Sequence, residues 1–161
     1  MDYVPGETLE AYLKREGKLS VADFTTVFGR VAAALHAAHT AKRRIVHRDV
    51  KPANVMVRKT ADGWDVKVID FGLALTAGLR AESRALHPSR RSTRDLATAG
   101  TLKYAAPEQL GEAGYPVGPH SDEYAFGKTA IEALLGTTSP TPRHWKQLPD
   151  TLVPHRTSFS E

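Results

Sequence analysis

One segment, residues 47–72, constrains the fold of this 161-residue chain more than any other. It opens with a charged stretch, "HRD", at 47–49 and continues into two valine-rich runs, "NVMVR" and "WDVKVIDFG", which are joined by a turn at 61–63. Valine-rich runs on either side of an Asp-Gly turn are typical of a β-hairpin. Such a hairpin would bring Asn54, before its first strand, beside Asp70, at the end of its second strand. We therefore expect a polar site at the base of a hairpin.

Helices are predicted on both sides of this hairpin. A short helix is expected after Thr8, and a longer one over residues 20–40, where Ser20 and Asp23 form a start typical of a capping box. The buried stripe predicted for the longer helix consists of Phe24, Val27, Phe28, Val31, Leu35 and Ala38. A third helix is predicted over 121–136, capped at its first residue and closed by a glycine.

Two connecting segments are less regular. Residues 45–47, "IVH", are predicted as a short strand that leads into the charged stretch. Residues 73–99 show no clear period and carry five arginines. A solvated loop is favoured there over a nucleic-acid contact, and a loop of this length is usually functional or mobile.

The composition excludes several classes of protein. There is no cysteine, which rules out disulfides and thiolate zinc sites. The net charge of +4 is too small to indicate nucleic-acid binding by itself. The longest apolar stretch, "VAAALHAAH", is interrupted by histidine and far too short to cross a bilayer. We expect a globular, cytoplasmic protein with no nucleic-acid partner and no membrane segment in this stretch.

Three short motifs follow one another in order: "HRDVKPAN" at 47–54, "DFG" at 70–72 and "APE" at 106–108. Together with Asp122 in the third predicted helix, they resemble the serine/threonine protein kinase family. The resemblance covers residues 1–136 and implies an α+β, mainly helical fold, the large C-terminal lobe of a kinase with its short β-hairpin.

The resemblance also implies that the lobe is truncated at both ends. The chain would begin at the hinge and lack the smaller N-terminal lobe, with its glycine-rich loop and strand lysine. Residues 137–161 would be an irregular, Pro- and Thr-rich tail. On this view the 161 residues alone are expected to be inactive, because half of the ATP cleft is missing.

By resemblance the cofactors are ATP and Mg²⁺, and the partner is a protein substrate. Phosphoryl transfer needs in-line positioning and neutralisation of negative charge, with little covalent work by the protein. Asp49 would take the proton of the attacking hydroxyl, and Lys51 would contact the γ-phosphate. Asn54 and Asp70 would hold magnesium, which prefers oxygen ligands.

The N-terminal stretch "MDYVPGETL" resembles the hinge that binds adenosine. Met1 would occupy the gatekeeper position, and the backbone groups of Asp2 and Val4 would contact adenine. Glu7 would reach the ribose, and Met56 would form the floor of the adenine pocket.

Supporting positions follow from the same resemblance. Arg48 would pair with a phosphorylated residue of the activation loop, which suits a forked guanidinium. His47 would pack against Phe71, which with Gly72 completes the "DFG" motif, and Asp122 would anchor this stack.

Two further residues belong to the later motifs. Thr101 would bridge the catalytic aspartate and lysine, a pairing that marks serine/threonine rather than tyrosine specificity. Glu108 would form an ion pair with an arginine, for which the sequence offers no clear candidate.

Two other functions use the same residues. One is a pseudokinase-like binding or regulatory module, which would not depend on magnesium and ATP. The other is a small-molecule phosphotransferase of the aminoglycoside type, against which "APE" and the Thr101–Lys51 pairing weigh.

His36 and His39 have the spacing of metal ligands on a helix, but without a third ligand a packed helix face is favoured.

Overall fold

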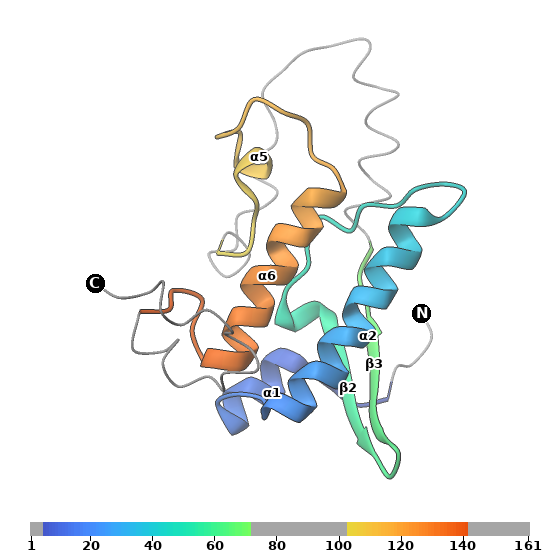
Figure 1. Cartoon of the computed structure of the whole chain (residues 1–161), viewed down its shortest axis with the longest axis vertical. Helices are drawn as coiled ribbons and strands as arrows, with labels where there is room; N and C mark the ends of the chain where they lie inside the picture. The colour runs from blue at the N-terminus through green and yellow to red at the C-terminus, as the bar shows by residue number, and fades with distance from the viewer. Residues whose placement is uncertain (1–4, 72–102, 142–161) are drawn as a thin grey trace, which may run out of the picture.

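The computed structural model describes residues 5–71 and 103–141, drawn in colour in Figure 1. Within these ranges the chain has four α-helices, one 3₁₀ turn and one three-stranded antiparallel sheet of order β1-β2-β3, so the predicted α+β class is confirmed. The elements are β1 (Glu7–Thr8), α1 (Leu9–Glu16), α2 (Val21–Thr40), η1 (Pro52–Asn54), β2 (Val55–Thr60), β3 (Gly63–Val68), α5 (Pro107–Leu110) and α6 (Pro119–Leu135).

The first two helices begin at the caps that the sequence predicts. The Thr8 hydroxyl accepts a hydrogen bond from the Ala11 backbone N–H at 3.1 Å, and the Ser20 hydroxyl accepts one from that of Asp23, also at 3.1 Å. Such caps satisfy N–H groups that have no partner inside the helix, each worth about 1 kcal/mol. The buried residues of α2 are Val27, Phe28, Val31 and Leu35, all members of the predicted stripe.

The hairpin is also confirmed. Its register runs from Val55 opposite Val68 to Thr60 opposite Gly63, which leaves a two-residue turn. Trp64, at the start of β3, is buried and donates its indole N–H to the Asp23 carboxylate at 2.6 Å. This bond, helped by the Ser20 hydroxyl, lowers the pKa of the Asp23 carboxyl. The hairpin is thereby joined to the first turn of α2.

A close backbone approach places β1 on the sheet. Glu7 lies opposite Val57 of β2, and Gly6 precedes it with φ +122°. A Cβ atom on Gly6 would lie 2.5 Å from the Val57 carbonyl oxygen. Only glycine satisfies both the backbone angle and the contact here, because a side chain would force β1 away from β2.

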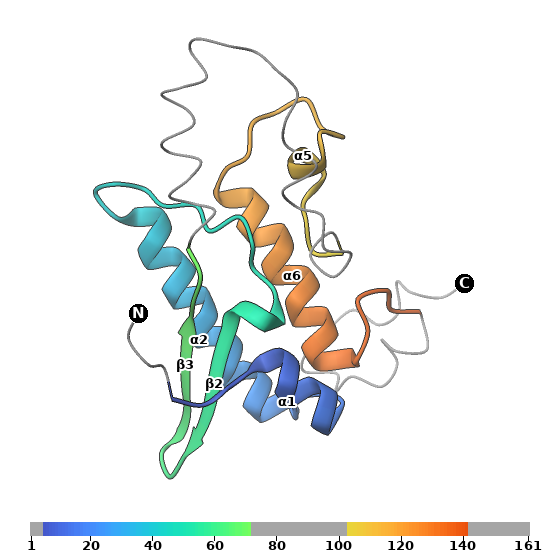
Figure 2. The ribbon, with the colours of Figure 1, turned by 180° about the vertical axis from the view of Figure 1, so that it is seen from behind.

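Two helices and the sheet form the frame of the molecule. Figures 1 and 2 show α2 and α6 side by side, with the hairpin along α2 and α1 crossing the lower end of both. The backbone N–H of Leu19 donates to the Ala133 carbonyl at 2.8 Å, which ties the α1–α2 connection to α6.

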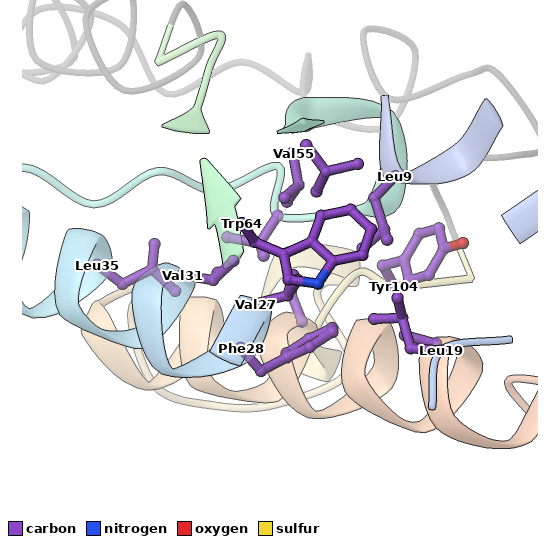
Figure 3. Packing of buried hydrophobic residues seen from close by; sticks show 13 residues of the cluster. Leu9, Leu19, Val27, Phe28, Val31, Leu35, Val55, Trp64 and Tyr104 are labelled. Atoms are coloured by element: carbon purple, nitrogen blue, oxygen red, sulfur yellow. The ribbon is translucent and has the colours of Figure 1, made fainter. Parts of the chain in front are cut away.

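The core lies between these elements, with Trp64 near its centre (Figure 3). Each fully buried aliphatic side chain contributes about 1.5–3 kcal/mol relative to its exposed state. The core residues labelled in Figure 3 are Leu9, Leu19, Val27, Phe28, Val31, Leu35, Val55, Trp64 and Tyr104. None of the helices within the described ranges is both long and apolar enough to cross a membrane.

Two predictions of local structure were wrong. Helix α6 begins at Pro119 with Gly118 as its cap, and Ser121 lies in the first turn, where its hydroxyl accepts from the Gly118 N–H at 3.1 Å. Residues 45–47 form no strand, because their backbone groups bond elsewhere. Ile45 N–H donates to the Ala38 carbonyl at 3.0 Å, and His47 N–H donates to a side chain of α6.

Candidate active site

Asp122, in the first turn of α6, organises the loop that carries the "HRD" residues. Its side chain is fully buried. One carboxylate oxygen accepts the His47 N–H at 2.8 Å and lies 2.7 Å from Nε2 of His39, and the other accepts the Arg48 N–H at 2.7 Å. A buried carboxylate is stable only when it is paired in this way. Asp122 therefore anchors the loop to α6.

The backbone on each side of the site has an unusual conformation. Arg48 has φ +69° and Asp70 has φ +63°, the positive-φ non-glycine residues of the described chain. Each such residue costs of order 1–3 kcal/mol and persists only where surrounding contacts enforce it. For Arg48 those contacts include the hydrogen bond from its N–H to Asp122.

Asp49 is surrounded by the two residues predicted to act with it. Its Oδ2 atom lies 2.8 Å from the Lys51 ammonium and accepts the side-chain N–H of Asn54 at 2.9 Å. The Asp49 backbone carbonyl accepts the same Asn54 amide nitrogen at 2.8 Å. The carboxylate is thus oriented from two sides, and the Asp49 side chain remains 11% exposed.

The base of the hairpin brings the two predicted metal ligands to one end of the sheet. Asn54 and Asp70 flank the paired strands, and the Ile69 N–H donates to the Asn54 carbonyl at 2.9 Å. The Asn54 amide nitrogen donates to two oxygens of Asp49, and this fixes which end of the Asn54 amide is the nitrogen. The amide oxygen of Asn54 is therefore directed away from Asp49.

This donor set fits a magnesium ion bound together with phosphates. An amide oxygen and the exposed Asp70 carboxylate are hard oxygen ligands, and two protein ligands plus phosphate are typical for Mg²⁺. No cluster of three or more His, Asp or Glu side chains that could hold a metal by itself occurs in the described residues. His36 and His39 form no such cluster either.

The ring of His47 also connects the "HRD" loop to the end of the hairpin. His47 is fully buried, and its Nε2 atom lies 2.9 Å from the Ile69 carbonyl. Its ring centroid lies 4.4 Å from that of Phe71, with the planes tilted by 55°. The predicted contact between the first two motifs is therefore present in the structure.

The nucleotide-binding residues are described only in part. The Glu7 carboxylate forms a bidentate pair with Arg15, at 2.7 and 2.9 Å, so it is engaged by the end of α1. Met56 lies opposite Thr8 in the sheet and is half-buried. Met1, Asp2, Val4, Gly72 and Thr101 lie outside the described residues, as does the segment 73–99. Their assigned functions remain predictions.

A model of the protein kinase domain family matches residues 1–150, which include every element described above. The chain belongs to the protein kinase family. Its relatives include serine/threonine-protein kinase PknA of Mycobacterium tuberculosis, 35% identical over 136 residues, with 84% of this kinase chain and 28% of PknA covered. PknB of Mycobacterium leprae is 35% identical over 136 residues, with 84% of this chain and 19% of PknB covered.

A solved structure agrees with this kinase assignment. The crystal structure of a double mutant of the Mycobacterium tuberculosis PknI kinase domain matches with a TM-score of 0.58 and 28% identity. The match covers 86% of this chain and 44% of the PknI chain. The kinase chain therefore spans less than half of each of these relatives.

Glu108 of the "APE" motif has partners other than the predicted arginine. Its carboxylate accepts the Ser121 hydroxyl and lies 3.3 Å from Nε2 of His120, and its side chain is 2% exposed. No arginine of the described segments contacts it. Both partners come from the first turn of α6, which places α5 against that helix.

Glu108 should make stability depend on pH. Burial acts to raise the pKa of its carboxyl, but the Ser121 hydroxyl, the Glu108 backbone N–H and nearby His120 outweigh this and leave the pKa below its ordinary value of 4.5. A lowered folded-state pKa stabilises the fold above about pH 4.5, and that contribution is lost as the pH falls through the folded-state value. We expect Glu108→Gln to lower the urea midpoint more at pH 7 than at pH 3.5.

The control for this comparison is Glu112→Gln, since Glu112 is exposed. Its urea midpoint should match that of the parent at both pH values. An effect of Glu108→Gln that is equal at pH 7 and pH 3.5 would contradict the assigned ionisation.

Sequence reasoning missed two residues of the site. His39 was assigned only to a packed helix face, yet it contacts the buried carboxylate of Asp122. Gln109 was not singled out at all, and it donates to the Arg48 carbonyl at 2.7 Å. The periodicity of α2 could have indicated His39, because it lies one turn beyond Leu35 of the buried stripe. No pattern in the sequence indicates Gln109.

Proposed function

We propose that this chain is the C-terminal lobe of a serine/threonine protein kinase and takes part in transfer of the γ-phosphate of ATP to protein hydroxyls. The observation that carries the proposal is the grouping of Asp49, Lys51 and Asn54 within hydrogen-bonding distance, with Asp70 at the same end of the hairpin. Kinship with PknA and PknB supports serine and threonine as acceptors. A cytoplasmic location is part of the proposal, because ATP is available there.

In this reaction the substrate hydroxyl oxygen attacks the γ-phosphorus, the bond to the β,γ-bridging oxygen breaks, and ADP leaves. Asp49 orients the hydroxyl and accepts its proton as the new bond forms. Lys51, 2.8 Å from Asp49, supplies positive charge beside the transferred phosphoryl group. Asn54 and Asp70 would hold magnesium together with the phosphates, and the ion would supply positive charge against them there.

The proposal predicts a magnesium-dependent nucleotide site at Asp70. We expect Asp70→Asn to weaken ATP binding by about tenfold or more in the presence of Mg²⁺, because a charged ligand becomes a neutral one. Without Mg²⁺ the variant should bind ATP at least as tightly as the parent, because the Asp70 carboxylate then repels the phosphates. Isothermal titration of the 161-residue chain with ATP, with and without MgCl₂, measures this difference.

Asp65→Asn is the matched control, since Asp65 is a hairpin carboxylate paired with Arg58 at 3.0 Å and is remote from the strand ends that carry the site. It should bind Mg²⁺–ATP as the parent does. If Asp70→Asn binds Mg²⁺–ATP as tightly as the parent, the metal assignment is wrong. The alternative of a scaffold-like regulatory module would then be favoured.

A further inference from the structure

Gln109, the third residue of α5, makes two hydrogen bonds with opposite ends of its amide. Its oxygen accepts the Ala106 backbone N–H at 3.1 Å, and its nitrogen donates to the Arg48 carbonyl at 2.7 Å. Both partners are backbone groups with fixed polarity, so the orientation of the amide is decided by chemistry. The side chain thus connects the start of α5 to the residue before Asp49.

The Arg48 carbonyl belongs to the peptide group that carries the Asp49 N–H. On its other side, the Arg48 N–H is held by the buried carboxylate of Asp122. Side chains from α6 and α5 therefore hold both backbone polar groups of Arg48, a residue with φ +69°. The Asp49 N–H of the same peptide also donates to Nδ1 of His47, at a longer 3.3 Å. Removing either of the two shorter contacts would weaken the restraint on a backbone conformation that is unfavourable for a non-glycine residue.

A small pocket lies between the loop and the segment that leads into α5, and Asp49, Tyr104 and Gln109 are among the residues that line it. Nε of Arg48 is buried and has no hydrogen-bond partner in the part of the chain that the structure describes. Among the described residues, the side-chain hydrogen bond to the Arg48 carbonyl comes from Gln109.

We propose that Gln109 is a positioning residue, which holds the Arg48–Asp49 peptide so that the Asp49 carboxylate faces the acceptor hydroxyl. The effect on catalysis rests on the proposed function of Asp49. The claim that Gln109 holds the Arg48–Asp49 peptide does not depend on that function. A competing explanation is that Gln109 only caps α5, through Ala106. The two explanations differ because the cap uses the amide oxygen, whereas positioning uses the amide nitrogen.

Two variants separate these explanations. Gln109→Glu keeps an oxygen for the Ala106 N–H but loses the donor to Arg48, and Gln109→Leu loses both. In the full-length protein, positioning predicts that both variants lower kcat by about 10- to 100-fold with KM for ATP unchanged, since small misplacements of a catalytic group have effects of this size. Capping alone predicts a loss with Gln109→Leu only. Glu112→Gln, an exposed neighbour, is the control and should leave kcat unchanged.

A second measurement needs no phosphate transfer, so it tests the positioning of Asp49 separately from the proposed function. The ¹⁵N shift of the Asp49 amide responds to a hydrogen bond at the Arg48 carbonyl, because the two groups share one peptide. We expect it to move in Gln109→Glu and Gln109→Leu but not in Glu112→Gln. An Asp49 resonance that is the same in parent and Gln109→Glu would overturn the positioning of Asp49 by Gln109.

Discussion

In the full-length protein, Asp49→Asn is expected to lower the rate of phosphoryl transfer by about 10²- to 10⁴-fold, the usual contribution of a general base. Asparagine keeps the size of the side chain and an acceptor oxygen for Asn54, but it cannot take the proton of the attacking hydroxyl. Affinity for Mg²⁺–ATP should stay close to that of the parent, because Asn54 and Asp70 are unchanged. Transfer of labelled phosphate to a serine-containing peptide and titration with ATP measure the two effects.

The control for this substitution must change a carboxylate outside the site that is also paired with a basic side chain. Asp65→Asn, on the hairpin, meets that requirement and should leave the rate unchanged. Transfer by Asp49→Asn at the parental rate would show that another group accepts the proton. A loss of ATP binding in the same variant would instead place Asp49 among the nucleotide ligands.

Asp122→Ala is expected to lower the free energy of unfolding by about 3–5 kcal/mol, a large share of the stability of a small domain. The substitution removes the acceptor of the His47 and Arg48 N–H groups and the partner of His39. Buried donors without an acceptor each cost about 1–3 kcal/mol. Urea unfolding followed by tryptophan fluorescence measures the change, since Trp64 is buried in the core.

Glu123→Ala is the matched control, because it is the next residue of α6 and is exposed. Its unfolding free energy should lie within about 0.5 kcal/mol of the parent. An equally small effect of Asp122→Ala would mean that water replaces the carboxylate, and that Asp122 does not anchor the loop.

Local sequence signals predicted most of the elements. Caps at Thr8 and Ser20 and the apolar stripe of α2 depend on residues within one or two turns of each other. Both caps were confirmed, as were four of the six residues of the stripe; Phe24 and Ala38 are only half-buried. The turn at 61–63 predicted the hairpin for the same reason. The strand expected at 45–47 was wrong. A strand needs a partner strand, whereas here the backbone N–H groups bond to groups on α2 and α6. Valine and isoleucine favour a strand but do not reveal whether a partner is present.

The sequence by itself determined which residues could do the chemistry and that they lie close together. Asp49, Lys51 and Asn54 are neighbours in the chain, and hairpin pairing brings Asp70 to Asn54 whatever the rest of the fold does. These contacts follow from short-range geometry, which local residue types encode.

Only the tertiary structure decided what holds this group in place. Asp122 bonds to His47 across 75 residues of sequence, and Gln109 bonds to Arg48 across 61. These contacts depend on how α6 and α5 pack against the loop, and many arrangements of helices are compatible with the same local pattern. The positive φ of Arg48 is maintained by such distant contacts, because nothing within its own segment favours that conformation.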